Sequence, residues 1–248
     1  MIATLFLLEL YLSFQISIYN HLKEIVLSIS FNEILEMTEL EKFKSSPEIT
    51  HEYKSVKEGF HANVIAKTTE KPTANISLDG YILRSENSNI IQARKGSLSF
   101  HKVNGYQEFE SLLNQLIGIW NLLIKFSNKQ LTINKISVRY LNLIEKDKEQ
   151  SMNDVIKIDL SHPFGENITD KLIVIKYEDL VDSSISGNVT IANQKKANND
   201  SVLLDINLSK AITAKNEFSF ELFKELRQIK NKLFFQLITD KTKSKYNS

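Results

Sequence analysis

Apolar and polar positions alternate with two different periods along this chain. Residues 23–31, KEIVLSISF, have period two, which is typical of a half-buried strand. The apolar side of this strand carries Ile25, Leu27, Ile29 and Phe31. Residues 32–49, NEILEMTELEKFKSSPEI, have apolar positions near helical spacing, and they predict a helix that Asn32 caps and Pro47 ends.

Period two returns between Tyr53 and Val103, where it predicts an antiparallel meander of strands. These strands lie at about 53–67, 75–84, 89–95 and 97–103, and ENSN and KGS supply turns between the last three. A continuous helical stripe follows in residues 109–124, and it must lie on a sheet. Trp120 falls inside this stripe, so we assign it to the core rather than to a ligand platform. Residues 131–145 then predict a further strand.

A similar series of elements recurs after a polar segment. KLIVIKYEDL, SGNVTIANQ and SVLLDINLS predict strands, and residues 216–239 predict a second long amphipathic helix that Asn216 caps. The sequence therefore predicts an α+β fold with antiparallel sheets, two long amphipathic helices and two topologically similar strand-strand-helix halves. We divide the chain into an N-terminal extension or first element (1–22), an N-terminal half (23–146), a connecting segment (147–170) and a C-terminal half (171–248).

Composition narrows the possible functions. Lys and Arg total 31 against 30 Asp and Glu, so the net charge of +1 gives no overall field that would attract nucleic acid. The absence of cysteine excludes disulfides, thiolate metal sites and Cys nucleophiles, and it fits a cytoplasmic protein. Residues 2–14 are largely apolar, but Glu9 interrupts them and no basic residue precedes them, so we expect neither a signal peptide nor a membrane span. We expect no cofactor.

The segment ISVRYLNLIEKD, residues 136–147, sets three polar side chains inside an apolar strand. In an extended chain, Tyr140 and Asn142 share the apolar face, whereas Arg139 points to the other side. We therefore expect Tyr140 and Asn142 to build the core side of a central strand, with the Asn142 amide bonded to backbone groups. Arg139 is expected to be partly desolvated and paired with Asp205 or with a helix carboxylate, or else to contact a ligand.

Other polar residues could share a surface with Arg139. Asp205 and Asn207 lie on one side of the predicted strand SVLLDINLS, and Arg94 and His101 lie on adjoining strands. One carboxylate and one amide make a poor metal site, and none of the histidines has metal-ligand spacing, so we expect no metal. The ligand-binding candidates are Arg139, Asp205, Arg94 and His101.

The strand ISVRYLNLI resembles a motif of a sporadically distributed family of bacterial proteins of similar length and uncharacterised function. That motif reads apolar-Gly-apolar-Arg-Tyr-apolar-Asn-basic-Ile, and it is matched at Arg139, Tyr140, Asn142 and Ile144. Ser137 replaces the glycine and Leu143 replaces the basic residue. EIVLSISF, NIIQARKGSLSFHKVNGYQEFESL, LLDIN and LFFQLITD are also similar, so the resemblance covers residues 20–245. It implies no known reaction, and the sporadic distribution implies an association with mobile elements, defence islands or toxin–antitoxin neighbourhoods.

Three functional hypotheses follow. The first is a non-enzymatic bacterial interaction protein, such as an accessory, inhibitor or sensor subunit of an anti-phage defence or toxin–antitoxin-like system, with a partner encoded nearby or a second copy of the chain. The second is an enzyme or sensor for a phosphate-bearing small molecule or nucleotide, which requires the four ligand candidates to lie within about 8 Å of one cavity. The third, less favoured, is a nucleic-acid-binding protein.

Overall fold

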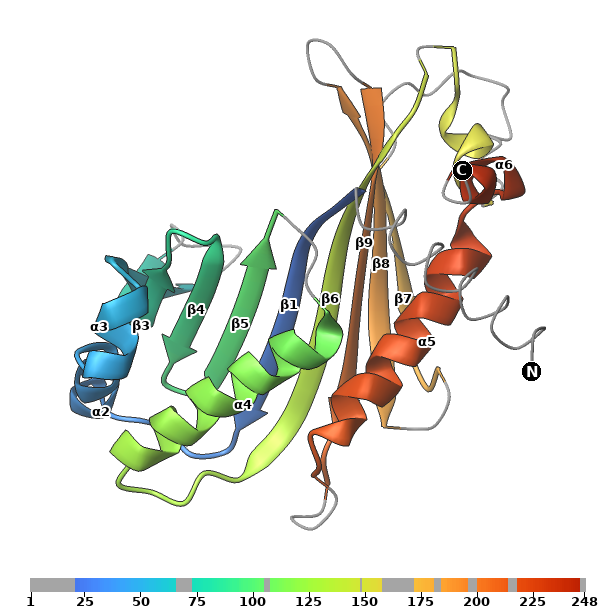
Figure 1. Cartoon of the computed structure of the whole chain (residues 1–248). Helices are drawn as coiled ribbons and strands as arrows, with labels where there is room; N and C mark the ends of the chain where they lie inside the picture. The colour runs from blue at the N-terminus through green and yellow to red at the C-terminus, as the bar shows by residue number, and fades with distance from the viewer. Residues whose placement is uncertain are drawn as a thin grey trace, which may run out of the picture.

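One antiparallel sheet of nine strands dominates the computed structural model (Figure 1). The structure describes residues 21–65, 73–104, 108–147, 149–157, 172–180, 184–195, 200–213 and 218–245. The strand order is β2-β3-β4-β5-β1-β6-β9-β8-β7. The strands are β1 (Leu22–Phe31), β2 (Ser55–Ile65), β3 (Thr73–Arg84), β4 (Asn89–Arg94), β5 (Ser97–Val103), β6 (Ile133–Glu145), β7 (Leu172–Tyr177), β8 (Ile185–Lys195) and β9 (Asp200–Ala211).

Five α-helices accompany the sheet within the described residues. They are α2 (Met37–Lys44), α3 (Pro47–Glu52), α4 (Phe109–Phe126), α5 (Glu221–Leu237) and α6 (Asp240–Ser244). The prediction of a mixed fold built on antiparallel strands is confirmed. The prediction of two long helices is not confirmed, because a third described helix, α2, also exceeds seven residues and packs beside α4.

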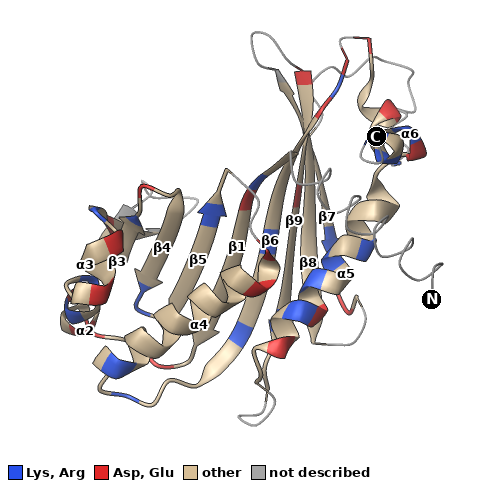
Figure 2. Ribbon diagram, viewed as in Figure 1, with Lys and Arg blue, Asp and Glu red and all other residues tan. Residues whose placement is uncertain are grey.

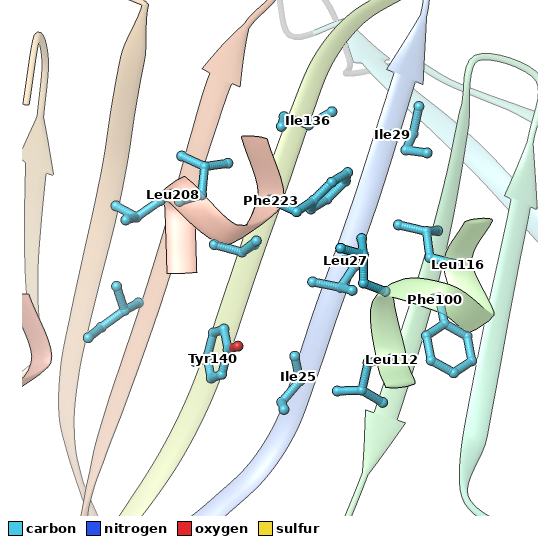
Figure 3. Close-up of a cluster of buried hydrophobic side chains, with 14 of the residues drawn as sticks. Ile25, Leu27, Ile29, Phe100, Leu112, Leu116, Ile136, Tyr140, Leu208 and Phe223 are labelled. Atoms are coloured by element: carbon cyan, nitrogen blue, oxygen red, sulfur yellow. The ribbon is translucent and has the colours of Figure 1, made fainter. Parts of the chain in front are cut away.

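Helices α4 and α5 cross the same face of the sheet (Figure 1). Period two turns the apolar residues of each strand toward them, so Leu27 of β1 and Ile136 of β6 are fully buried. Leu112 and Leu116 of α4 and Phe223 of α5 close this core from above (Figure 3). Trp120 is 4% exposed and packs against the Phe31 ring, which confirms its place in the core.

The prediction of one helix from Asn32 to Pro47 is wrong. The backbone N–H groups of Phe31 and Asn32 donate to the carbonyls of Gly96 and Thr132. The Asn32 side chain accepts from Asn134, so Asn32 caps no helix. Helix α2 begins after Glu36, whose backbone N–H is bound by the Glu39 carboxylate. Pro47 begins α3, because a proline at the first helical position forfeits no intrahelical bond. Asn216, the predicted cap of α5, lies outside the described residues.

The polar connecting segment is partly structured. Residues Met152–Asp154 form a 3-10 turn, and Ile156 forms an isolated β-bridge with Ile238 beyond α5. The described part of this segment is therefore packed against the end of α5. Strand β6 pairs with β1 on one side and with β9 on the other, so the two predicted halves share one sheet. The boundaries between the halves stay a prediction.

Candidate functional site

The sheet face opposite α4 and α5 carries no described helix, and we call it the open face. Directly paired residues of antiparallel strands point to the same side, so the register defines which side chains lie together on it. One row that crosses six strands consists of uncharged polar side chains: Gln92, Ser99, Ser28, Ser137, Ser209 and Ser186. The next row reads Ile90, His101, Val26, Arg139, Asn207 and Asn188. The open face is therefore polar along its centre.

A hydrogen-bonded chain of three side chains joins β5 to β1 on the open face. Glu24 Oε1 lies 2.7 Å from His101 Nδ1, and Ser99 Oγ lies 2.9 Å from His101 Nε2. The hydrogen bond with His101 lowers the pKa of Glu24, and the charges of Arg139 and Arg84 lower it further, so Glu24 is a carboxylate at neutral pH. A carboxylate can only accept, so Nδ1 carries the proton. In the neutral imidazole, Nε2 then accepts from the Ser99 hydroxyl.

The ion pair predicted for Arg139 is present on the open face. Its Nε lies 2.9 Å from Asp205 Oδ1 and its second guanidinium nitrogen lies 2.7 Å from Oδ2, which is bidentate geometry. This hydrogen bonding raises the pKa of Arg139. The Asp205 side chain is 13% exposed, whereas that of Arg139 is 44% exposed. Part of the guanidinium therefore remains accessible to a ligand.

Arg94 of β4 forms a separate pair with Asp79 of β3. It binds Asp79 at 2.9 Å, and its guanidinium carbon is 3.9 Å from the position of a Cβ at Gly59. Gly80 pairs with Gly59, and a Cβ on Gly80 would lie 2.0 Å from the Ala93 carbonyl oxygen, so the β3–β4 contact requires glycine there. Three strand spacings, roughly 14 Å, separate the strand of Arg94 from that of Arg139.

The structure therefore brings together some of the sequence candidates and not others. Arg139 and Asp205 are bonded, and His101 lies two strands away from Arg139 in the same row, while Arg94 lies apart from them. We call Ser99, His101, Glu24, Arg139 and Asp205 the central polar cluster. Two of its members, Glu24 and Ser99, were missed by sequence reasoning. The contact of Glu24 with His101 depends on the β1–β5 register, whereas Ser99 and His101 lie two residues apart on β5, so alternation along that strand was the available signal for their contact.

Tyr140 and Asn142 lie on the helix-covered face of β6. The Asn142 amide donates to the carbonyl oxygens of Leu204, at 3.2 Å, and of Tyr140, at 3.4 Å, as expected for a buried amide. The Tyr140 ring lies 3.7 Å below the ammonium nitrogen of Lys230 on α5. Burial lowers the pKa of Lys230 to about 7, and the charge of Arg227 acts in the same direction. The motif residues thus lie on both faces of the sheet, with Arg139 on the open face and Tyr140 and Asn142 on the helix-covered face.

Of two cavities, one lies away from the central polar cluster and the other lies beside it, where Asn207 pairs directly with Arg139. One, of about 430 Å³, lies between α3 and α4 and is lined by Ile49, Tyr53, Leu122 and Gly118, with Glu52 and Lys125 also lining it. Figure 2 shows that α4 is uncharged between its two ends beside this cavity. The other, of about 260 Å³, lies on β7–β9 and includes Asn188, Asn207 and Lys176. Neither of these two cavities is lined by Arg139, Asp205, Arg94 or His101.

Metal and membrane features complete the description. Among the described residues, no three His, Cys, Asp or Glu side chains are grouped as metal ligands would be. No helix within the described ranges has the length and apolar character needed to cross a membrane. No protein-family model matches the sequence, and a search of curated proteins finds no match. The fold thus defines a mixed α/β protein with one large antiparallel sheet, and the resemblance carried by β6 stays an expectation.

Proposed function

We propose that this chain is a binding protein that recognises a protein partner through the open face of its sheet. The observation that carries the proposal is a broad polar sheet face, with preformed charge pairs at its centre, that no described helix covers. Eight strand spacings make this face about 38 Å wide, and strands of about 20 Å give on the order of 800 Å². That area is sufficient for one side of a standard protein interface.

The charges of the open face favour an acidic partner. Lys57, Arg84, Lys135 and Lys176 are exposed there and form no ion pair within the described residues. Of the acidic residues that the register places on this face, Glu24 and Asp205 are each bound to a basic side chain, and Glu145 is exposed at the end of β6. Carboxylates of a partner could therefore pair with these exposed cations, and such pairing speeds and orients association.

The resemblance of the β6 motif supplies the biological context of the proposal. It favours a bacterial accessory, inhibitor or sensor subunit of an anti-phage defence or toxin–antitoxin-like system, located in the cytoplasm, with a partner encoded nearby. A second copy of the chain is the alternative partner. We also infer two related halves, because β1, β5, β4 and β3 on one side of the sheet centre correspond in order to β6, β9, β8 and β7 on the other.

Co-purification from the native host tests the proposal. The tagged chain should retain a partner, and Lys135→Glu together with Arg84→Glu should release it at moderate salt. Lys232→Glu, on the exposed side of α5, is the matched control and should retain it. Recovery of the unmodified chain as a lone monomer, or equal retention by all variants, would contradict an open-face interface.

Nucleic acid is a second candidate because three of the four arginines in the chain, Arg84, Arg94 and Arg139, belong to strands that present them on the open face. The four central strands, however, present no Phe, Tyr or Trp there on which bases could stack. Binding would therefore rest on phosphate contacts and should weaken steeply with salt. The small-molecule alternative is less favoured, since its four residues do not line a common cavity in the two described above.

A further inference from the structure

We propose that Ser99, His101 and Glu24 form a nucleophilic relay that gives the open face an acyl-transfer activity toward small activated esters. The relay has the bonding order that nucleophilic serine chemistry requires. Ser99 Oγ is within 2.9 Å of His101 Nε2, and His101 Nδ1 is held at 2.7 Å by Glu24. A serine within reach of a base, with that base oriented by a carboxylate, defines such a site whatever the order in the chain.

The surroundings fix the roles of the three groups. His101 lies between Val26 and Ile90 in its row and is 9% exposed, so its ring is held in place and shielded from water. Glu24 is ionised and holds the Nδ1 proton, which leaves the Nε2 lone pair directed at the Ser99 hydroxyl. The side chain of Glu24 is 26% exposed, and Arg84 and Arg139 stabilise its charge. Glu24 is thus a positioning residue, while Ser99 and His101 meet the reacting atoms.

Donors for a developing oxyanion flank Ser99 in the register. Gln92 of β4 and Ser28 of β1 are directly paired with Ser99, which places their Cβ atoms about 5 Å from its own. Neither side chain has a hydrogen-bond partner within the described residues, so the Gln92 amide and the Ser28 hydroxyl are available. Backbone N–H groups of these central strands are engaged in the sheet, which leaves side chains as the oxyanion donors.

The form of the surface limits the substrate. Ser99 is half-buried, and its row neighbours Ser28 and Ser137 are small, so an acyl group can approach from the open side. Ser99 lines neither of the two cavities described above, so neither of them would hold a long acyl chain beside it. The class of substrate that fits is therefore a short-chain ester with a good leaving group, free in solution or carried on a docked partner.

The reaction proceeds in two balanced steps. Ser99 Oγ forms a bond to the acyl carbon, its proton passes to His101 Nε2, and the ester carbon–oxygen bond breaks as the leaving alcohol takes that proton. Water then attacks the acyl-serine with His101 again accepting a proton, which releases the carboxylic acid and restores the Ser99 hydroxyl. No oxidant, reductant or metal is needed.

A fluorophosphonate probe tests the relay, because it forms an Oγ–phosphorus bond with release of fluoride and marks activated serines. The purified chain should gain one adduct, located at Ser99 by peptide mass spectrometry. Ser99→Ala should lose this adduct, and His101→Gln should slow it at least ~100-fold. Ser137→Ala removes a hydroxyl from the same row without a histidine beside it and should label normally.

Two further measurements separate chemistry from structure. Glu24→Gln should slow labelling at least ~10-fold and shift its pH profile, because the amide cannot hold the Nδ1 proton in the same way. Circular dichroism should show each variant folded. Turnover of p-nitrophenyl acetate should fall in step with the loss of the Ser99 adduct. Absence of an adduct on Ser99 in the folded chain, or labelling that is unchanged in His101→Gln, would overturn the proposal whether or not a partner is found.

Discussion

Replacement of Lys230 by methionine is predicted to stabilise the protein. Lys230 lies on the sheet side of α5 with 8% of its surface exposed, and its ammonium nitrogen lies 3.7 Å above the Tyr140 ring and 5.9 Å from that of Phe234. Within the described residues no carboxylate pairs with it, and Arg227 adds a like charge nearby. Methionine has a similar length and apolar character, so it fills the same space without a charge.

The magnitude of the stabilisation by Lys230→Met follows from the pKa of the buried amine. Burial is the main cause that lowers this pKa from 10.5 to about 7, a change that corresponds to on the order of 5 kcal/mol between the charged and neutral forms. The contact with the Tyr140 ring offsets about 2 kcal/mol of this when the amine is charged. The Lys230→Met variant should therefore be more stable at pH 7 by on the order of 2–3 kcal/mol.

The lowered pKa of Lys230 in the folded chain also determines how the stability depends on pH. Between pH 7 and pH 10.5 the unfolded chain binds more protons at this site than the folded chain, so the free energy of unfolding of the unmodified protein rises with pH over this range. The advantage of the methionine variant should therefore shrink from pH 7 to pH 9.5. Urea unfolding at both pH values, with exposed Lys232→Met as the control on the same helix, measures the difference.

One result would refute the reasoning about Lys230. If Lys230→Met were less stable than the unmodified protein at pH 7, the amine would have to be charged and compensated in the folded state. A constant difference between the two proteins from pH 7 to pH 9.5 would lead to the same conclusion, because a group that does not titrate differently cannot contribute to the slope.

Three further predictions concern stability. A double-mutant cycle of Arg139→Ala and Asp205→Ala should give a coupling of about 1 kcal/mol in urea unfolding; no coupling would mean that the observed ion pair is not maintained in solution. Gly118→Ala in α4 should raise stability by about 1 kcal/mol in thermal unfolding, since a Cβ there meets no atom within 4 Å, and a loss would reveal a contact that needs glycine. Burial raises the pKa of Glu39, but the backbone N–H groups of Asn128 and Glu36 bind its carboxylate and lower the pKa by more. Glu39→Gln should therefore lower the free energy of unfolding by about 1–3 kcal/mol at pH 7 and by less below pH 4.5. An equal loss of stability at pH 3 and pH 7 would contradict this.

The elements of the sheet were predictable because period two is strong in this sequence. Strands β1, β4, β5, β6 and β9 lie close to their predicted positions, and alternation alone placed Arg139 and Asp205 on the face away from the core. The division of residues 32–52 into α2 and α3 was missed, since apolar spacing continues through both helices. The capping residues Glu36 and Glu39 were the available signal for the start of α2.

The central polar cluster was predictable only in part. Alternation gives the face of each side chain but not the register of neighbouring strands, and the contact of Glu24 with His101 arises solely from the β1–β5 register. Lys230 had a clearer signal. It is spaced four residues from Leu226 and from Phe234, so it falls within the apolar stripe of α5. A lysine is unusual at such a buried position, and this signal was present in the sequence.

The polar residues of the β6 motif act on opposite faces, and the register connects them. A slip of one residue between β6 and β9 would turn Arg139 into the core and expose Tyr140. The Asn142 amide bonds to the Leu204 carbonyl across this strand pair and opposes such a slip from the buried side. With the register held, Arg139 reaches Asp205 on the open face, and its charge acts on Glu24 of β1. The motif residues on the buried face, Tyr140 and Asn142, therefore hold the strand register that positions Arg139 for any ligand of the open face.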